Sequence, residues 1–303
     1  MTLETTQDAG RARLVAIGLM CAAVLLFSAL DASAKWLSAS MDPLQVVFAR
    51  YAGSMLLVLA LLNPWTRPGV FRTGKPGLQI VRSLLLLGST ALNFFAVKYL
   101  QLAETVSIMF ATPLLVALLS GPLLGEWPGP RRLVAIAIGF VGVIVVTRPG
   151  VGGMHPAAFL AALGCVCYSF YSLTTRILAR HDSSETTMIY SGLAGTVIIV
   201  PLLPLYWNTP TTSLEWGLML MTGVLGGFGH WLLILAHRLA PATVLAPFMY
   251  SQIVWMIGLG WFVFGQWPDS WTFAGASIVI GSGLYLLYRE RVRAKSEASA
   301  RLD

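Results

Sequence analysis

Hydrophobic residues occur along this chain in long runs that short polar gaps separate. Most runs contain about 20 residues, the length that an α-helix needs to cross the hydrocarbon core of a bilayer. The runs predict membrane helices at about residues 14–34, 44–62, 78–97, 103–124, 133–146, 156–178, 186–205, 214–236, 243–264 and 271–288. We therefore expect an all-α integral membrane protein with ten transmembrane helices.

The composition excludes an ordinary soluble domain. Hydrophobic residues make up 56% of the 303 residues and charged residues only 11%, against about 25% charged residues in soluble domains. The net charge of +7 does not indicate nucleic-acid binding, because the basic residues are scattered among the polar gaps. Cys21, Cys165 and Cys167 lie inside apolar runs and fit neither a disulfide framework nor a zinc site. We expect no cofactor and no metal.

The basic residues predict the orientation of the chain in the membrane. With ten helices, 15 of them fall on the side of the two termini and three on the other. The 15 are Arg11, Arg13, Arg67, Arg72, Lys75, Arg131, Arg132, Arg176, Arg180, Arg238, Arg289, Arg291, Arg293, Lys295 and Arg301, and the three are Lys35, Lys98 and Arg148. Because basic residues concentrate on the cytoplasmic side, we expect residues 1–13 to be a cytoplasmic N-terminal segment and residues 289–303 a cytoplasmic basic tail.

One stretch of the chain occurs twice. Residues 93–128 resemble residues 230–268, and Phe110 aligns with Phe248 at a spacing of 138. In the same alignment Asn93 and His230 occupy matched places, at a spacing of 137.

The repeat divides the chain into halves of five predicted helices, residues 14–148 and 156–288. Since five is an odd number, the second half enters the membrane from the opposite side. Inverted repeats of this kind place a binding site near the middle of the membrane, and movement of one half against the other exposes that site to each side in turn. The sequence thus favours a carrier that works by alternating access.

The chain resembles the EamA-type transporters of the drug/metabolite transporter superfamily over about residues 13–290. The motif residues are Pro43, Phe48, Arg50, Asn93, Ala96, Tyr99, Ala103, Val106, Pro113, Gly125, Glu126, Pro130, Gly139 and Gly142. The resemblance implies an inverted five-plus-five arrangement and a central cavity lined mainly by the third, fourth, eighth and ninth helices. Members of this family move amino acids, nucleotide-like metabolites such as S-adenosylmethionine, vitamins such as riboflavin, and toxic compounds. The second half departs from the motif, with Gln266 in place of Glu126 and Ser251 in place of Pro113.

Polar and aromatic residues in the repeated helices are candidates for substrate binding. They are Asn93, Phe94, Phe110, His230, Trp231, Phe248, Tyr250 and Gln252. Mid-helix aromatic rings can stack on a planar ligand, while the alternative roles are ordinary packing and hydrogen bonds between helices. Candidates for gating or structural roles are Arg50, Pro113, Glu126 and Pro247.

The carboxylates are expected near the membrane boundaries. Asp31 lies near the outer end of the first helix, four residues before Lys35, so we expect the two to pair. For Glu126 we expect a local ion pair with Arg131 or Arg132. Without a carboxylate in mid-membrane, we expect facilitated diffusion or exchange, unless the first helix lies deeper or His230 carries a proton.

Other classes of function are less well supported. Ala32-Ser33-Ala34 has the form of a signal-peptide cleavage site, but the preceding run is long for a signal and has a counterpart in the second half. No enzyme motif and no polar ring typical of a channel is present. We expect a multi-pass carrier of the bacterial inner membrane whose partners are a small organic solute and the lipid bilayer. An exporter of drugs or toxic metabolites is the alternative, and the substrate, the direction and the oligomeric state stay open.

The predicted orientation is testable by labelling in intact cells. Single cysteines replacing Ala9, Gly152 and Ala298, in a background without the native cysteines, are treated with a thiol reagent that does not cross membranes. Because the positive side faces the cytoplasm, only the cysteine at position 152 should react. Labelling at position 9 or 298 but not at position 152 would overturn the orientation.

Overall fold

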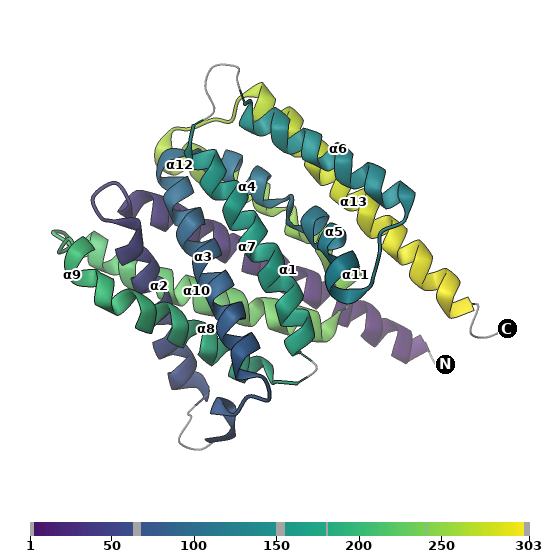
Figure 1. Cartoon of the computed structure of the whole chain (residues 1–303), viewed down its shortest axis with the longest axis horizontal. Coiled ribbons are helices and arrows are strands. Elements are labelled where there is room, and N and C mark those ends of the chain that lie inside the picture. The colour runs from purple at the N-terminus through teal and green to yellow at the C-terminus, as the bar shows by residue number, and fades with distance from the viewer. Residues whose placement is uncertain (1–2, 63–67, 150–154, 180, 241, 300–303) are drawn as a thin grey trace.

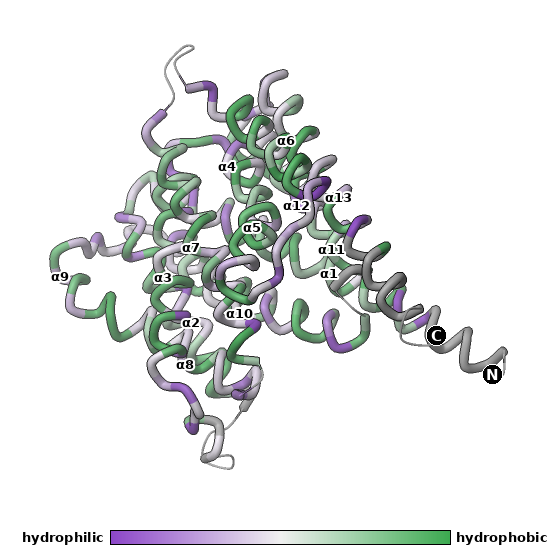
Figure 2. Tube along the Cα trace, turned by 45° about the vertical axis from the view of Figure 1, so that its right-hand side comes forward, coloured by the Kyte–Doolittle hydropathy of each residue, from purple (hydrophilic) through white to green (hydrophobic). Residues whose placement is uncertain are grey.

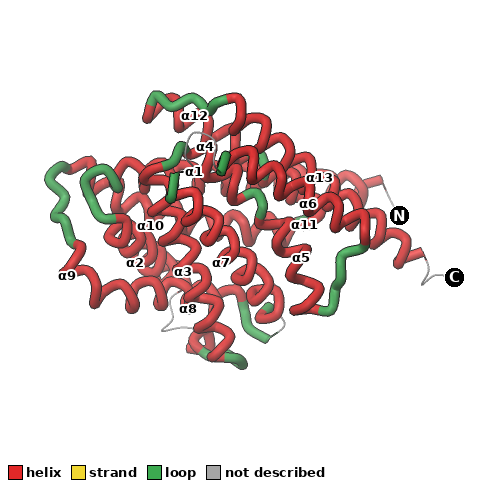
Figure 3. Tube along the Cα trace, turned by 45° about the horizontal axis from the view of Figure 1, so that its top comes forward, coloured by secondary structure: helices red, strands yellow, loops and turns green. Residues whose placement is uncertain are grey.

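The computed structural model describes residues 3–62, 68–149, 155–179, 181–240 and 242–299 (Figure 1). These residues form helices joined by short loops, with no strand among them (Figure 3). The helices are α1 (Leu3–Leu37), α2 (Pro43–Leu62), the 3₁₀ turn η1 (Pro68–Phe71), α3 (Pro76–Tyr99), α4 (Leu102–Met109), α5 (Thr112–Leu124), α6 (Pro130–Thr147), α7 (Ala157–Leu178), α8 (Ser184–Ile199), η2 (Val200–Leu202), α9 (Leu203–Tyr206), α10 (Ser213–Leu239), α11 (Ala242–Met249), α12 (Gln252–Phe264) and α13 (Ser270–Ser299).

Within the described residues, ten helical segments are long and apolar enough to cross a membrane. Hydrophobic residues run along most of their length (Figure 2). Three of these segments combine consecutive elements: α4 with α5, α8 with η2 and α9, and α11 with α12. The predicted fold class, an all-α protein with ten membrane-spanning helices, is confirmed.

The helices at the two ends of the chain are longer than the hydropathy pattern predicts. Helix α1 begins at Leu3, well before the apolar run, and α13 continues through the predicted polar tail to Ser299. The tail is rich in Arg, Glu, Lys and Ala, which are strong helix formers in the absence of any packing requirement. Residues 300–303 of the predicted tail and residues 150–154, which connect the predicted halves, lie outside the described residues.

The fourth and ninth membrane segments are each broken near the middle. The first break, at Phe110 and Ala111, follows from Pro113, which has no N–H to donate to the carbonyl of Met109. The hydroxyl of Thr112 donates to that carbonyl instead, at 2.7 Å. The second break follows α11, and there the hydroxyl of Ser251 donates to the carbonyl of Phe248 at 2.6 Å.

The positions of the two breaks correct the alignment of the halves. Helices α4 and α5 recur as α11 and α12 at a constant offset of 140 residues. The equivalent of Phe110 is therefore Tyr250, and the predicted match to Phe248 is wrong. Helices α3 and α10 also end 140 residues apart, so the position that matches Asn93 at this end is Leu233. The earlier alignment rested on scattered identities, whereas helix ends and breaks fix the register of the backbone.

Helices from the first half pack mainly on helices from the second half. Helix α1 lies along α10, α3 along α7, and α6 along α13, while α2 contacts both α8 and α10 (Figure 1). The broken segments also meet, since α12 contacts α4. The halves are therefore interlocked, and the centre of the molecule is built from both.

Polar contacts join the loops at one end of the molecule. Asp182, between α7 and α8, accepts hydrogen bonds from the hydroxyl of Thr73, the backbone N–H of Gly74 and the side-chain amide of Gln79. Burial would raise the pKa of the Asp182 carboxyl, but these hydrogen bonds together hold it below its usual value. The start of α3 is thereby fixed to the α7–α8 loop.

The opposite end has its own contacts between the halves. Gln45 exchanges two hydrogen bonds of 2.8 Å with the backbone of Asn208. Arg148, after α6, forms an ion pair of 2.6 Å with Asp269, just before α13. Each contact joins loops that ten alternating crossings place on the same side of the membrane.

Helices α2 and α10 cross at two glycines. A Cβ atom on Gly223 would lie 2.5 Å from the Cα atom of Gly53, and a Cβ atom on Gly53 would lie 2.8 Å from the Cα atom of Gly223. The hydroxyl of Ser54 donates to the carbonyl of Gly223 at 2.9 Å. Small residues at such a crossing let helix backbones approach closely, and packing of this kind holds helices together in lipid.

Substituting Gly223 tests this crossing. Alanine normally favours a helix over glycine by about 0.5–1 kcal/mol, yet Gly223→Ala should destabilise the protein by roughly 1–3 kcal/mol through overpacking. The matched control is Gly217→Ala in the same helix, where a new Cβ meets no atom within 4 Å. Thermal unfolding in detergent should show a lower midpoint for the first variant alone. Equal midpoints would contradict the close crossing.

Candidate functional site

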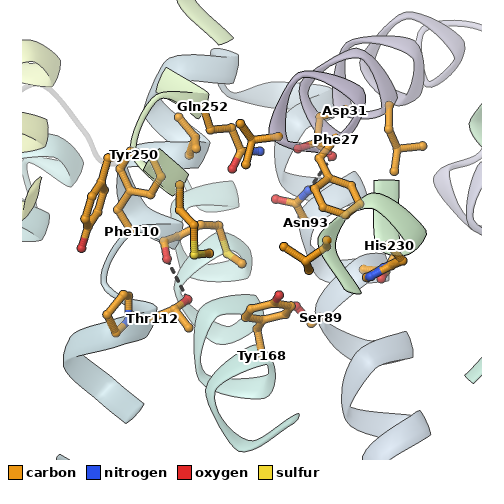
Figure 4. A pocket seen from close by; sticks show the side chains of 18 of the residues that line it. Phe27, Asp31, Ser89, Asn93, Phe110, Thr112, Tyr168, His230, Tyr250 and Gln252 are labelled. Atoms are coloured by element: carbon orange, nitrogen blue, oxygen red, sulfur yellow. Dashed lines mark hydrogen bonds between the residues drawn. The ribbon is translucent and has the colours of Figure 1, made fainter. Parts of the chain in front are cut away.

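A cavity of about 250 Å³ lies between the two halves (Figure 4). Its walls come from α1, α2, α3, α4, α5 and α7, and from α10, α11, α12 and α13. The resemblance implied a cavity lined mainly by the third, fourth, eighth and ninth helices. Those four segments do supply most of the lining, and the structure adds four residues of the first segment and one each of the second, sixth and tenth, which are Arg50, Tyr168 and Leu287.

The breaks in the fourth and ninth segments form an aromatic wall. Phe110 and Tyr250 occupy the two breaks, and their rings meet edge to face with centroids 4.9 Å apart. Both side chains are buried and both line the cavity. Among the described residues the hydroxyl of Tyr250 has no hydrogen-bond partner, and it lies against α13, where a Cβ atom on Gly283 would collide with its oxygen. The absence of a side chain at Gly283 therefore makes room for Tyr250.

Polar side chains gather on the opposite side of the cavity. In Figure 4, Asp31, Asn93 and His230 lie on one side, with Phe110 and Tyr250 across from them. The amide of Asn93 donates to a carboxylate oxygen of Asp31 at 3.1 Å. The ring of His230 packs edge to face on Phe27 with centroids 5.1 Å apart, and none of the described hydrogen bonds involves it. The polar wall thus combines side chains of α1, α3 and α10.

The predicted pair between Asp31 and Lys35 is wrong. Lys35 is buried and donates to the carbonyls of Val97 and Leu100, at 2.8 and 2.7 Å. These carbonyls lie at the C-terminal end of α3, which favours a nearby positive charge. Lys35 thereby joins α1 to α3, and Asp31 is left to face the cavity.

The depth of Asp31 removes the basis for the expectation of facilitated diffusion. That expectation assumed that no carboxylate lies within the membrane core. Asp31 lines the central cavity together with Pro113, at the break in the fourth segment. Helix α1 also continues beyond the predicted apolar run to Leu37, so Asp31 lies six residues before its end.

Arg50 is buried at the cavity wall, with 7% of its surface exposed. It donates to the hydroxyl of Thr90 at 2.7 Å and lies over the ring of Tyr51 at 4.8 Å. Its Nε–H is buried and has no hydrogen-bond partner in the part of the chain that the structure describes. Arg50 and His230 also line a second, smaller hollow, and Arg82 lines that hollow as well. Arg50 thus joins α2 to α3, as a structural residue would, and it also lines the cavity.

Six of the eight predicted substrate-binding residues line the cavity. These are Asn93, Phe94, Phe110, His230, Tyr250 and Gln252. Trp231 does not: its side chain is 44% exposed and borders a different hollow, on the far side of α10. Phe248 packs against a cluster of α1 and α10. In both cases the rotation of the helix, which sequence cannot fix, turns the ring away.

The predicted gating or structural residues also divide. Pro113 lines the cavity beside the first break, whereas Pro247 lies within α11 and outside the lining. Glu126 forms a bidentate ion pair with Arg176 of α7, at 2.7 and 2.9 Å. This pair joins the two halves, whereas the expectation from the sequence was a local pair within the turn after α5.

Several lining residues escaped the sequence analysis. Phe27 and Tyr168 were not among the candidates, and Asp31 was expected near the outer boundary and not in the binding site. The available signal was Asp31 itself, since a carboxylate within an apolar run is costly unless it faces protein or water. Ser89 and Thr90 also line the cavity, but hydroxyls in membrane helices usually bond to their own backbone and carry no clear signal.

Comparison with known proteins places the chain among membrane transporters. The model of the EamA-like transporter family matches residues 14–148 and again residues 155–289. An S-adenosylmethionine uptake transporter of Rickettsia conorii is 25% identical over 94% of this chain and 96% of its own length. A riboflavin transporter of Vibrio cholerae is 25% identical over 92% and 94%, and the pseudopaline exporter CntI of Pseudomonas aeruginosa is 29% identical over 84% and 89%. One crystal structure, 20% identical, aligns with a TM-score of 0.65 over 91% of this chain and 98% of that one, which shows a shared fold.

The contact between Gly283 and Tyr250 can be tested by a double-mutant cycle. Gly283→Ala should lower the thermal midpoint, because the new methyl group collides with the hydroxyl of Tyr250; overpacking of this kind costs roughly 1–3 kcal/mol. Combining it with Tyr250→Phe removes the colliding oxygen and should restore part of the loss. Gly281→Ala, which meets no atom within 4 Å, is the control. Strictly additive effects of the two substitutions would show that Tyr250 does not occupy this position.

Proposed function

Because the chain belongs to the EamA-like transporter family, we propose that it is a secondary carrier for a medium-sized organic metabolite with a planar ring. The single observation that supports this proposal is the two-sided cavity, with the aromatic wall of Phe110 and Tyr250 facing the polar wall of Asp31, Asn93 and His230. A planar ring can stack on the first wall while polar groups of the same solute bind the second. S-adenosylmethionine, riboflavin and aromatic amino acids all have this character.

The arrangement of the halves supports alternating access. The cavity lies where the broken segments meet, and its walls come from both halves. Each half would supply part of the binding surface throughout the cycle, while inverted repeats rock against each other around it. The cross-half ion pairs Glu126–Arg176 and Arg148–Asp269 lie toward opposite ends of the molecule. Each pair is suited to hold the cavity closed toward its own side of the membrane while the other pair is broken.

We place the carrier in the bacterial inner membrane with both termini in the cytoplasm. The support is the asymmetry of the basic residues and the bacterial origin of the relatives. The protein moves its solute without changing it chemically. Export is the second candidate for the direction of transport, because the relative from Pseudomonas aeruginosa is named as an exporter.

A ligand screen combined with three variants tests this function. Riboflavin, S-adenosylmethionine and tryptophan are compared with glucose by thermal shift of the purified protein, since a bound ligand raises the melting temperature by mass action. At least one ring-containing solute should raise it and should be transported by proteoliposomes. Asn93→Ala and His230→Ala should then each lower transport by roughly tenfold, the effect expected from losing one hydrogen bond of a buried ligand.

The matched control is Trp231→Ala, which removes a large side chain next to His230 but outside the cavity. Its transport rate should stay near that of the unaltered protein. Stabilisation by glucose alone would contradict the proposed class of substrate. Equal losses in all three variants would show that the polar wall has no special part in transport.

A further inference from the structure

The central cavity is lined by two side chains of opposite charge, an aspartate and an arginine, that form no direct ion pair with each other among the described residues. They are Asp31 of α1 and Arg50 of α2. Charged groups within a membrane protein are costly and usually pair with each other or bind a substrate or ion.

The carboxylate of Asp31 has capacity for a further hydrogen-bond donor. One of its oxygens accepts from Asn93, and no described hydrogen bond reaches the other. A carboxylate offers about four acceptor positions, and the Asp31 side chain is only half-buried because part of it faces the cavity. An ammonium or sulfonium group of a solute in the cavity would find a negative charge there.

A second buried arginine shows how unusual the position of Arg50 is. Arg82 of α3 donates to the hydroxyls of Thr175, Ser191 and Tyr171 and to the carbonyl of Thr187. Its guanidinium is fully engaged in joining α3 to α7 and α8, and Arg82 is therefore structural.

Arg50 is as deeply buried but has fewer partners: its guanidinium donates to Thr90 and contacts Tyr51, and its Nε–H has no hydrogen-bond partner among the described residues. A buried donor without a partner requires an explanation. None of the ion pairs among the described residues involves this guanidinium, although its planar fork matches the geometry of a carboxylate. A solute that carries a carboxylate would supply the missing acceptor and the missing negative charge.

We propose that the cavity binds a zwitterionic solute, whose cationic group pairs with Asp31 and Asn93 and whose carboxylate pairs with Arg50. The ring of the same solute packs on Phe110 and Tyr250. The amino-acid portion of S-adenosylmethionine or tryptophan has the required charges, whereas riboflavin leaves both protein charges unpaired. This inference rests on the proposed carrier function and narrows its substrate class to solutes that combine an amino-acid group with a ring.

The first experiment uses the unaltered protein in nanodiscs and two matched series of ligands. Tryptophan is compared with tryptamine, which lacks the carboxylate, and with indolepropionate, which lacks the ammonium group. S-adenosylmethionine is compared with methylthioadenosine, which keeps the adenosine group but lacks the amino-acid portion. Within at least one series the zwitterion should bind roughly tenfold tighter than its analogues, since each charge-assisted hydrogen bond contributes at least that factor.

The second experiment assigns each charge to its residue. Asp31→Asn should abolish the preference for tryptophan over indolepropionate, while leaving the affinity for indolepropionate nearly unchanged. Arg50→Gln should abolish the preference for tryptophan over tryptamine, and Arg50→Lys should keep part of it. Glu185→Gln removes a negative charge outside the cavity and serves as the control, with all preferences retained. If a variant does not fold, the comparison of ligands on the unaltered protein still tests whether the cavity prefers a zwitterion.

The outcomes separate the inference from the carrier function. If riboflavin, tryptamine or methylthioadenosine binds and is transported as well as the zwitterions, the carrier function stands and the inference is overturned. If Asp31→Asn weakens all ligands equally, the charge assignment is likewise overturned. If no compound of either series, nor riboflavin, binds or is transported, the proposed class of substrate falls together with the inference.

Discussion

Every backbone N–H and C=O group inside the hydrocarbon must find a partner within the protein, and the broken fourth and ninth segments are where this constraint acts most strongly. Pro113 removes a helical hydrogen bond at the first break, and the hydroxyl of Thr112 restores a partner to the exposed carbonyl. Ser251 has a comparable part at the second break. Such irregular backbone is tolerated only where protein surrounds it, so the breaks must lie at the centre of the bundle.

The position of the breaks in turn shapes the cavity. A continuous helix would place its side chains at regular intervals around its axis, whereas each break turns one aromatic ring inward. Phe110 and Tyr250 meet there and separate the cavity from the helices behind them. Close helix crossings, such as the one at Gly53 and Gly223, leave room for few side chains elsewhere. The space for a solute is therefore concentrated where the helices are interrupted.

Charged side chains distinguish the wall of the cavity that lies opposite Phe110 and Tyr250. Lys35 and Arg82 are buried, but each donates to several protein oxygens and holds helices together. Asp31 and Arg50 are the charged groups that line the cavity. Buried charged side chains thus either hold helices together or line the cavity. The difference lies in how many of their hydrogen-bonding groups find partners within the protein.

The sequence by itself determined the number of membrane helices, their approximate limits and the family, because long apolar runs and motif residues need no partner to be recognised. It also identified several of the residues at the centre, including Asn93 and His230. Only the tertiary structure decided which side of each helix faces inward. His230 and Trp231 are neighbours in the chain, yet they lie on different sides of α10, and Asp31 faces the cavity because Lys35 bonds to α3 instead. Helix rotation and register depend on packing between segments distant in the chain, and a single sequence carries no direct record of those contacts.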